Sequence, residues 1–409
     1  MELFYRDCSL ESEIYWTNLI EELNQIERYN PFCKSKDYYS IFCHIIISLL
    51  LGEEIILLDS DFSEEELVKL TGYSNFESFN KPIYRKKLEV IRSKTHLLNC
   101  IDQSKSEWEI TLFTSGTTGI PKKVTHNFKT MSRFVKISTT INIWGFAYNP
   151  THIAGLQVFF QAFLNGNPII RLFGLSQQEI LKEIKEYGIT HISATPTFFR
   201  LLLPIKGVYP SITRITSGGE KFNVKIIEQL KTVFPNAKIT NVYASTEAGT
   251  LFAAEGDLFT IKPEMKLLVK IENSELFIHQ SLMGVTGINN SQWYATADLV
   301  DIIDSNPLKF RFQSRKNEMI NVGGYKVNPH EVEDVIRNIP EVSDVRVFAK
   351  ANSVLGNIIC CEIVKINSEL NEANIRLFLQ SKLQEFKIPR MIRFVEHLAT
   401  TRTGKIKRN

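Results

Sequence analysis

The stretch from Thr114 to Lys122, TSGTTGIPK, combines small, hydroxyl-bearing and basic residues in a pattern suited to holding phosphate groups. Gly116 and Gly119 allow the backbone to turn sharply and to approach a ligand closely. The flanking hydroxyls and N–H groups are donors for phosphate oxygens, and Lys122 adds a positive charge. The spacing GxxxxGK[ST] is absent, so this is not a Walker loop. An ordinary surface loop rich in Ser, Thr and Gly has a similar composition, so both interpretations stay open for the loop alone.

A second candidate segment, NVYASTE, ends at Glu247 and begins within a strand expected at Lys238–Tyr243. Ligands of open α/β sheets bind at the carboxyl ends of strands. Mg²⁺ bound to a nucleotide takes one or two carboxylates together with phosphate oxygens, and Glu247 is a suitable ligand. Taken singly, Glu247 is equally consistent with a strand-end acid that faces water.

Three further segments follow in the chain. They are Thr296–Asp298, the stretch SRKNEMINVGGYKV at Ser314–Val327, and TRTGKI at Thr401–Ile406. By itself, Lys405 would be one of several solvated lysines in a basic tail. Its place after a Thr-Gly pair, and the order of all five segments along the chain, give it more weight.

The order and spacing of these segments resemble the acyl-adenylate-forming superfamily. That superfamily contains acyl-CoA synthetases, the adenylation domains of non-ribosomal peptide synthetases and firefly-type luciferases. The resemblance covers roughly residues 40–409 and is most specific at 114–122 and 314–327. It implies that ATP and Mg²⁺ activate a carboxylic acid as an acyl-adenylate, which is then passed to a thiol.

The resemblance also implies a role for each matching position. A mobile loop over the β- and γ-phosphates would comprise Thr114, Ser115, Gly116, Thr117, Thr118, Gly119 and Lys122. The adenine would be framed by Gly218, Gly219, Glu220, Asn241 and Tyr243. Thr246 would contact the α-phosphate, Glu247 would bind Mg²⁺, and Asp298 and Arg315 would hold the ribose hydroxyls. Lys405 would bridge the substrate carboxylate and the α-phosphate, and Gly323 and Gly324 would line the thiol channel.

The acid substrate is predicted from the segment PTHIAGL at residues 150–156. His152 matches the aromatic or histidine gate beside the acyl site of the superfamily. Members that activate amino acids commonly place an Asp at the next position, where this chain has Ile153. Burying an ammonium group without a partner is costly, so we expect an acid without an α-amino group. The run from His152 to Phe163 most resembles aryl- and acyl-CoA ligases of the o-succinylbenzoate type, and its phenylalanines either line the acid pocket or pack in the core.

The sequence therefore predicts an AMP-forming acid–thiol ligase whose partners are a small carboxylic acid and CoA. A stand-alone enzyme that loads the phosphopantetheine of an acyl carrier protein is an alternative that the residues do not separate from a CoA ligase. A non-catalytic relative that only binds nucleotide is a second alternative, disfavoured by the presence of Glu247 and Lys405.

Several positions depart from the usual superfamily pattern. Lys123 replaces a small residue, and Ala297 stands where a glycine is usual before the ribose-binding Asp298. Asn317, Asn321 and Ala399 replace other common residues. None of these changes removes a group that the expected chemistry requires.

The elements that must position these residues alternate between strand and helix. Helical spacing at 177–187 and 224–234 precedes apolar strands at 189–194 and 238–243, which is typical of βαβ units. We therefore expect an α/β protein with a large layered domain at 1–314, abbreviated at its start, that holds mainly parallel sheets and a β-rich layer. A small α+β domain at 315–409, mobile by resemblance, would follow.

Composition excludes other classes of protein. The formal charge of the 409 residues is only +3, which argues against a dedicated nucleic-acid binder. One run, Ile41–Leu51, is nearly all apolar but too short to span a bilayer. The six cysteines form no CxxC pair, so we expect reduced thiols and a cytoplasmic protein.

Overall fold

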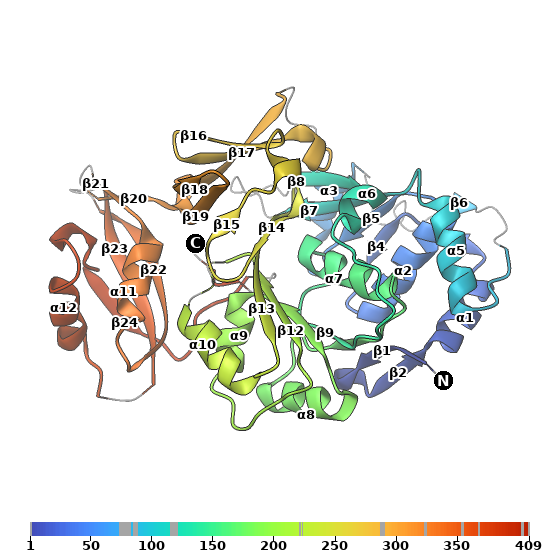
Figure 1. Cartoon of the computed structure of the whole chain (residues 1–409), viewed down its shortest axis with the longest axis horizontal. Coiled ribbons are helices and arrows are strands. Elements are labelled where there is room, and N and C mark those ends of the chain that lie inside the picture. The colour runs from blue at the N-terminus through green and yellow to red at the C-terminus, as the bar shows by residue number, and fades with distance from the viewer. Residues whose placement is uncertain are drawn as a thin grey trace. The chain divides into compact units, whose positions relative to one another are not determined.

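The computed structural model describes residues 2–72, 83–84, 89–114, 122–220, 222, 224–286, 291–322, 325–352, 356–366, 369–401 and 405–407. The chain forms two compact units (Figure 1). Unit 1 comprises Met1–Gly256 and Gln280–Gln292, and unit 2 comprises Asp257–His279 and Trp293–Asn409.

Unit 1 contains an eight-stranded sheet in the order β14-β13-β12-β11-β9-β10-β1-β2. In that order its strands are Gly249–Ala254, Lys238–Ser245, Arg214–Gly218, His191–Ala194, Trp144–Phe146, Ile169–Arg171, Leu3–Asp7 and Ser12–Tyr15. All pairs from β13 to β1 are parallel, whereas the edge strands β14 and β2 are antiparallel to their neighbours. Parallel strands need crossover connections, and α8 (Gln177–Tyr187), α9 (Pro196–Leu202) and α10 (Val224–Val233) provide them.

A smaller sheet in unit 1 has the order β4-β5-β7-β8. Its strands are Phe32–Lys34, Ile55–Leu58, Glu109–Thr114 and Lys122–Asn127, and the short pair β3 (Arg28–Tyr29) and β6 (Ile83–Tyr84) lies apart from it. The last two strands of the smaller sheet are antiparallel, with Thr114 opposite Lys122, so the segment of the predicted phosphate loop connects them. The remaining helices of unit 1 are α1 (Trp16–Gln25), α2 (Tyr38–Leu51), α3 (Glu64–Thr71), α5 (Lys94–Ser104), α6 (Phe128–Ser132) and α7 (Ile153–Phe163), with a 3₁₀ turn at each of Cys8–Leu10 and Gln280–Leu282.

Aromatic residues of α2 and α7 build the core of unit 1. The rings of Phe42 and Phe159 stack with centroids 4.7 Å apart, and those of Phe159 and Phe163 with centroids 5.3 Å apart. Phe160 is likewise fully buried and lies against Trp108. Of the two possibilities for the α7 phenylalanines, core packing is the one that the structure shows.

Unit 2 contains two sheets and a hairpin. The five-stranded sheet has the order β15-β19-β18-β17-β16, with strands Phe259–Thr260, Leu308–Arg315, Trp293–Ser305, Glu275–His279 and Val269–Glu272. The hairpin pairs β20 (Ile320–Val322) with β21 (Tyr325–Val327). The three-stranded sheet β22-β23-β24 (Val342–Asn352, Gly356–Lys365 and Met391–Phe394) packs with α11 (Pro329–Ile336) and α12 (Glu372–Gln380) around a common core. Short 3₁₀ turns lie at Pro263–Met265, Lys316–Glu318 and Glu385–Lys387.

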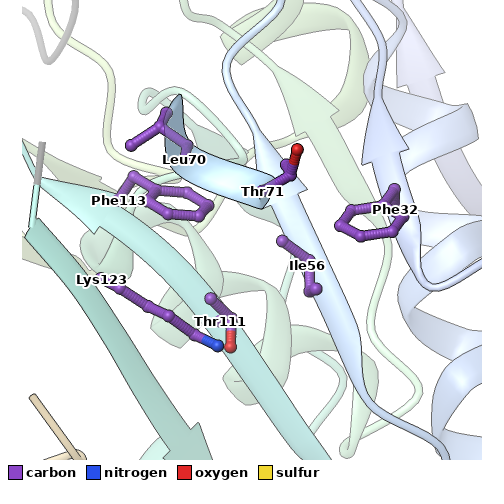
Figure 2. A pocket seen from close by; sticks show the side chains of 7 residues that line it. All are labelled: Phe32, Ile56, Leu70, Thr71, Thr111, Phe113 and Lys123. Carbon is purple, nitrogen blue, oxygen red and sulfur yellow. The ribbon is translucent and has the colours of Figure 1, made fainter. Parts of the chain in front are cut away.

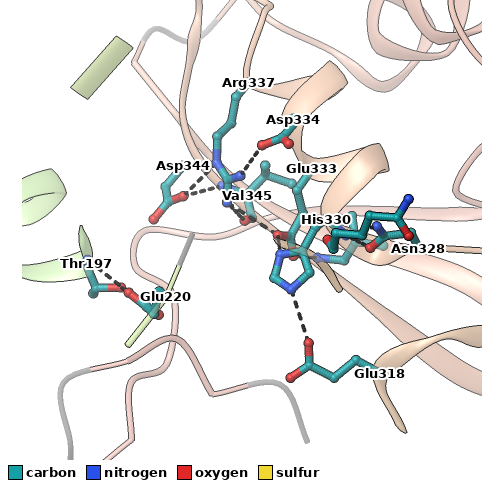
Figure 3. A network of polar contacts seen from close by, with 12 residues as sticks. Thr197, Glu220, Glu318, Asn328, His330, Glu333, Asp334, Arg337, Asp344 and Val345 are labelled. Carbon is teal, nitrogen blue, oxygen red and sulfur yellow. Dashed lines mark hydrogen bonds and ion pairs between the residues drawn. The ribbon is translucent and has the colours of Figure 1, made fainter. Parts of the chain in front are cut away.

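A buried polar network in unit 2 attaches the turn after β19 to α11 (Figure 3). Glu333 is fully buried, and its Oε1 accepts a hydrogen bond from Val347 N at 2.9 Å. Its Oε2 lies 3.4 Å from His330 Nδ1, while His330 Nε2 lies 3.1 Å from Glu318 Oε2. Because a buried carboxylate needs partners of this kind, Glu318 is tied to the C-terminal α+β part of the unit.

The expected fold class is confirmed, and most elements lie where the residue patterns place them. Helix α8 has the expected bounds, and β13 continues two residues beyond the expected Tyr243, to Ser245. The predicted boundary between residues 314 and 315 concerns which parts move together, and it stays a prediction. Within the part of the chain that the structure describes, none of the helices has both the length and the apolar character needed to cross a membrane.

Candidate active site

The candidate residues of unit 1 gather where β12 and β13 end. Gly218 pairs with Val242, and a Cβ atom on Gly218 would lie 2.7 Å from the Val242 carbonyl oxygen. Gly219 has a φ of +85°, in the region that favours glycine. The two strands can therefore approach and turn as they do only because both positions lack a side chain.

The carboxylate of Glu220 is used within the protein. Its Oε2 accepts hydrogen bonds from the N–H (3.1 Å) and the hydroxyl (2.6 Å) of Thr197 in the first turn of α9 (Figure 3). An acid at a helix N-terminus satisfies free N–H groups and complements the helix dipole. The turn at 218–220 is thereby fixed to α9, and it is the backbone of this turn that remains for a ligand.

Two predicted adenine contacts come from β13, and both are anchored by β14 or the residues after it. Asn241 is 7% exposed and donates through Nδ2 to the Gly256 carbonyl oxygen at 2.9 Å. The ring of Tyr243 stacks on Phe252, with centroids 5.9 Å apart and an interplanar angle of 23°. Both side chains are thus held in place by strand pairing at the sheet edge.

The turn that carries Thr246 and Glu247 is held by the smaller sheet. The Nε2–H of His126, in β8, donates to the Thr246 carbonyl oxygen at 2.7 Å, which fixes the tautomer because a carbonyl only accepts. The Glu247 carbonyl oxygen accepts from Gly284 N at 2.7 Å. Arg133 donates to the Ala248 carbonyl oxygen at 3.3 Å. In the described part of the chain, the Glu247 carboxylate itself makes no hydrogen bond or ion pair.

Sequence reasoning missed His126 and Arg133. A histidine and an arginine in strand and helix patterns give no signal of their own, because their partners are backbone carbonyls about 120 residues away. Burial lowers the pKa of His126, and so does the nearby charge of Arg133, although the hydrogen bond to Thr246 acts in the opposite direction. His126 is therefore a neutral donor that stabilises the turn.

The candidate residues of unit 2 form an ion pair across β18 and β19. Asp298 lies directly opposite Arg315, and Arg315 Nε donates to Asp298 Oδ1 at 2.8 Å. Asp298 is 6% exposed, whereas the Arg315 side chain is 54% exposed. The Asp298 N–H also donates to the Thr296 hydroxyl at 3.1 Å. The two predicted ribose contacts are thus brought together, with the acid fixed and the base reaching solvent.

Ala297 adopts a backbone conformation that its side chain disfavours. Its φ is +60°, and its N–H donates to Glu275 Oε1 at 3.0 Å. A left-handed conformation costs an L-residue roughly 1–2 kcal/mol, which glycine avoids. The departure from glycine at this position therefore places strain directly beside Asp298.

Lys405 lies next to an isolated antiparallel bridge in unit 2. Thr401 N donates to the Lys405 carbonyl oxygen at 2.6 Å, and Lys405 N donates to the Thr401 hydroxyl at 3.2 Å. Thr400 and Ile406 form an antiparallel bridge, and Ile406 is buried. The backbone of Lys405 is therefore held at a defined point of the C-terminal segment.

Some predicted positions lie outside the described residues. These are Ser115, Gly116, Thr117, Thr118, Gly119, Gly323 and Gly324. Thr114 and Lys122, on either side of residues 115–121, are described and are paired strand residues. The predicted roles of the seven stay predictions.

A small cavity lies on the smaller sheet under α3, lined by Phe32, Ile56, Leu70, Thr71, Thr111, Phe113 and Lys123 (Figure 2). Its volume is about 70 Å³, well below the roughly 300 Å³ at which ligand pockets begin. Lys123, one of the departures noted in the sequence, is among the residues that line it. This cavity is too small to be the site of an aryl acid.

Comparison with known proteins gives two family matches. The AMP-binding enzyme family matches residues 48–269, and the AMP-binding enzyme C-terminal domain matches residues 331–405. The 2-succinylbenzoate–CoA ligase of Staphylococcus aureus (strain Newman) is 26% identical over 413 residues, covering 92% of this chain and 81% of the relative. That of Listeria innocua serovar 6a is 26% identical over 328 residues, covering 73% of this chain and 68% of the relative.

Solved structures show the same fold. ATP-bound MatB from Rhodopseudomonas palustris superposes with a TM-score of 0.73 at 15% identity, covering 99% of this chain and 94% of that one. The o-succinylbenzoate CoA synthetase of Bacillus subtilis in complex with its acyl-adenylate intermediate superposes with a TM-score of 0.70 at 17% identity, with the same coverage.

The tautomer and burial of His126 predict an acid-sensitive contribution to stability. A lowered pKa in the folded state means that the unfolded state binds the proton first, so this contribution is present above about pH 6.5 and is lost as the pH falls. His126→Gln keeps an N–H donor but does not titrate. We expect the urea midpoint to fall less between pH 7.5 and pH 5.5 in His126→Gln than in the parent protein.

The matched control is His397→Gln at an exposed position, which should keep the parent pH dependence. Burial also lowers the pKa of His44, and that of His191 to about 4, so both add an acid sensitivity that all three proteins share. A His126→Gln protein with the same pH dependence as the parent would contradict the assignment.

The strain at Ala297 predicts that Ala297→Gly stabilises the protein. Relief of the left-handed conformation outweighs the extra chain entropy of glycine, so the free energy of unfolding should rise by about 1 kcal/mol. Ala295→Gly, in the same strand without a positive φ, should lower it by roughly 0.5–1 kcal/mol. Denaturant titration of both variants measures the difference, and a loss of stability in both would show that Ala297 is not strained.

Proposed function

The chain belongs to the AMP-binding enzyme family, and on that premise we propose that it uses ATP to activate a carboxylic acid without an α-amino group and transfers the acyl group to the thiol of CoA. The observation that carries the proposal is the hydrogen bond between His126 and Thr246. It joins the strand that follows the predicted phosphate loop to the turn that holds the predicted metal ligand. Two elements that act on one triphosphate must lie together in this way.

The residues of unit 1 fit a nucleotide with Mg²⁺. Glu247 supplies an oxygen ligand, which Mg²⁺ prefers, and the carboxylate is not engaged by other described groups while its backbone is fixed by Gly284. When bound, the metal would neutralise charge on the phosphates. In this proposal Thr246 contacts the α-phosphate, and Lys122 with residues 114–119 contacts the β- and γ-phosphates.

The chemistry proceeds in two steps. A carboxylate oxygen of the acid attacks the α-phosphorus, and pyrophosphate leaves; the thiol then attacks the acyl carbon of the mixed anhydride, and AMP leaves. The protein contributes position and charge rather than covalent bonds, since both nucleophiles are substrates. Lys405 would act in the first step by bridging the carboxylate and the α-phosphate. In the second step Gly323 and Gly324 would admit the thiol.

The polar network of Glu333, His330 and Glu318 lies on the C-terminal side of the boundary that we propose between residues 314 and 315. It attaches residue 318 to α11, so a pivot that lets the C-terminal part rotate would precede Glu318. This agrees with the proposed boundary at residues 314 and 315.

The proposed acid is an aryl or acyl acid. Ile153 is buried at the start of α7, where an apolar side chain offers no partner for an ammonium group. The names of the relatives from Staphylococcus aureus and Listeria innocua, 2-succinylbenzoate–CoA ligases, favour an aryl substrate and CoA as the acceptor. The phosphopantetheine of a carrier protein is the alternative acceptor.

We also place the chain in the cytoplasm, which its six free cysteines support.

The proposal predicts acid-dependent ATP–pyrophosphate exchange that requires Mg²⁺. Simple aryl and acyl acids should support exchange better than their α-amino counterparts. Glu247→Gln should reduce exchange by a few hundredfold, because charge stabilisation of this kind is worth roughly 3–4 kcal/mol. Glu228→Gln, an exposed acid on α10, is the matched control and should keep the parent rate. Nucleotide binding without exchange for any acid in a broad panel would favour a non-catalytic role.

Lys405 is predicted to act in only one half-reaction. Lys405→Ala should slow pyrophosphate exchange about a hundredfold through loss of a charge-assisted contact to the developing phosphorane. Given pre-formed acyl-adenylate and CoA, the same variant should form thioester at close to the parent rate. The control is Lys407→Ala, an exposed lysine two residues away, which should leave both rates unchanged. Equal slowing of both half-reactions in folded Lys405→Ala would contradict the alternating roles.

A further inference from the structure

A buried carboxylate faces the predicted gate histidine from the smaller sheet. Asp59 follows β5 directly and is 7% exposed. Its Oδ1 accepts a hydrogen bond from the hydroxyl of Thr151 and lies 3.8 Å from Nε2 of His152. Thr151 and Asp59 are 92 residues apart in sequence, so this contact exists only in the folded protein.

The loop before α7 is fixed on its other side as well. Asn149 Oδ1 accepts from Thr151 N at 3.0 Å, and the Asn149 carbonyl oxygen accepts from His152 N at 3.3 Å. A Cβ atom on Gly155 would lie 2.4 Å from the same carbonyl oxygen, so the first turn of α7 packs directly on the loop. With this backbone fixed, the side-chain torsions of His152 are the freedom that remains.

The charge of Asp59 restricts the side-chain torsions of His152. The His152 side chain is 20% exposed and the Asp59 side chain 9% exposed, so their interaction is shielded from solvent. A carboxylate in such a place is stabilised by an N–H group that faces it. At 3.8 Å the contact is longer than a hydrogen bond, so the negative charge of Asp59 acts electrostatically and favours the imidazole orientation with Nε2 toward it.

We propose that Asp59 is a positioning residue that holds His152 in the orientation needed to admit and align the carboxylic acid. The inference rests on the proposed function, since it gives His152 its place beside the acyl site. Asp59 acts through His152 and does not touch the nucleotide. Its removal should change the use of the acid and leave the use of ATP as it was.

A double-mutant cycle on pyrophosphate exchange tests the proposal. Asp59→Asn is nearly isosteric and keeps an acceptor for Thr151, but it removes the charge. We expect this variant to raise KM for the acid about tenfold with KM for ATP unchanged, and His152→Ala to raise KM for the acid at least as much. In the His152→Ala background, Asp59→Asn should add nothing, because residues that act as one unit are not additive.

Asp61→Asn is the matched control, since Asp61 is an exposed acid two residues further along and should behave as the parent. Asp59→Ala serves as a second variant if Asp59→Asn does not fold, as checked by circular dichroism. Additive effects of the two substitutions, a parent-like KM for the acid in Asp59→Asn, or equal rises in both KM values would each overturn the role of Asp59 alone. A parent protein that shows no exchange would instead overturn the proposed function, and this inference with it.

Discussion

The hydrogen bond from buried His126 to the Thr246 carbonyl oxygen is the contact on which the nucleotide half of the site depends. One partner lies in β8, directly after the predicted phosphate loop, and the other lies in the turn between β13 and β14. Among the described residues, this bond is the contact of Thr246 that connects the turn to the smaller sheet. The bond needs a proton on Nε2, which the neutral Nε2–H tautomer and the imidazolium both carry, and burial favours the neutral form.

Glycines and buried acids set the remaining geometry around this contact. Gly218 allows β12 to approach Val242, and the carboxylate of Glu220 fixes the following turn to α9. At Gly218 the lack of a side chain determines the course of the backbone, and at Glu220 a side chain does so. The ligand is then left with backbone groups and with side chains such as that of Glu247, which makes no hydrogen bond or ion pair with the described residues.

In unit 2, side-chain contacts also fix the backbone of the candidate site, but here one residue has a strained conformation. Asp298 and Arg315 are paired across two strands, and the backbone of Ala297 has a conformation that a glycine would adopt without strain. Strain that is kept beside a predicted ligand contact is typical of functional sites, because surrounding contacts such as the one to Glu275 Oε1 compensate for it. Glu247 and Lys405, which the proposal assigns to the same first step, belong to different units.

The sequence by itself determined the fold class, the order of elements and most of the candidate residues. Hydrophobic periodicity is a local property, so α8 and β13 could be placed from their own residues, and the spacing of Thr114–Lys122 and Ser314–Val327 was enough to indicate the family. Only the tertiary structure decided which side chains hold those residues in place. His126 with Thr246, Asp59 with His152, and the phenylalanines of α7 in the core are contacts between segments far apart in the chain, and no local pattern encodes them. The left-handed backbone at Ala297 was equally hidden, because an alanine in a strand pattern predicts an extended conformation, and it is the strand pairing and the bond to Glu275 that enforce another.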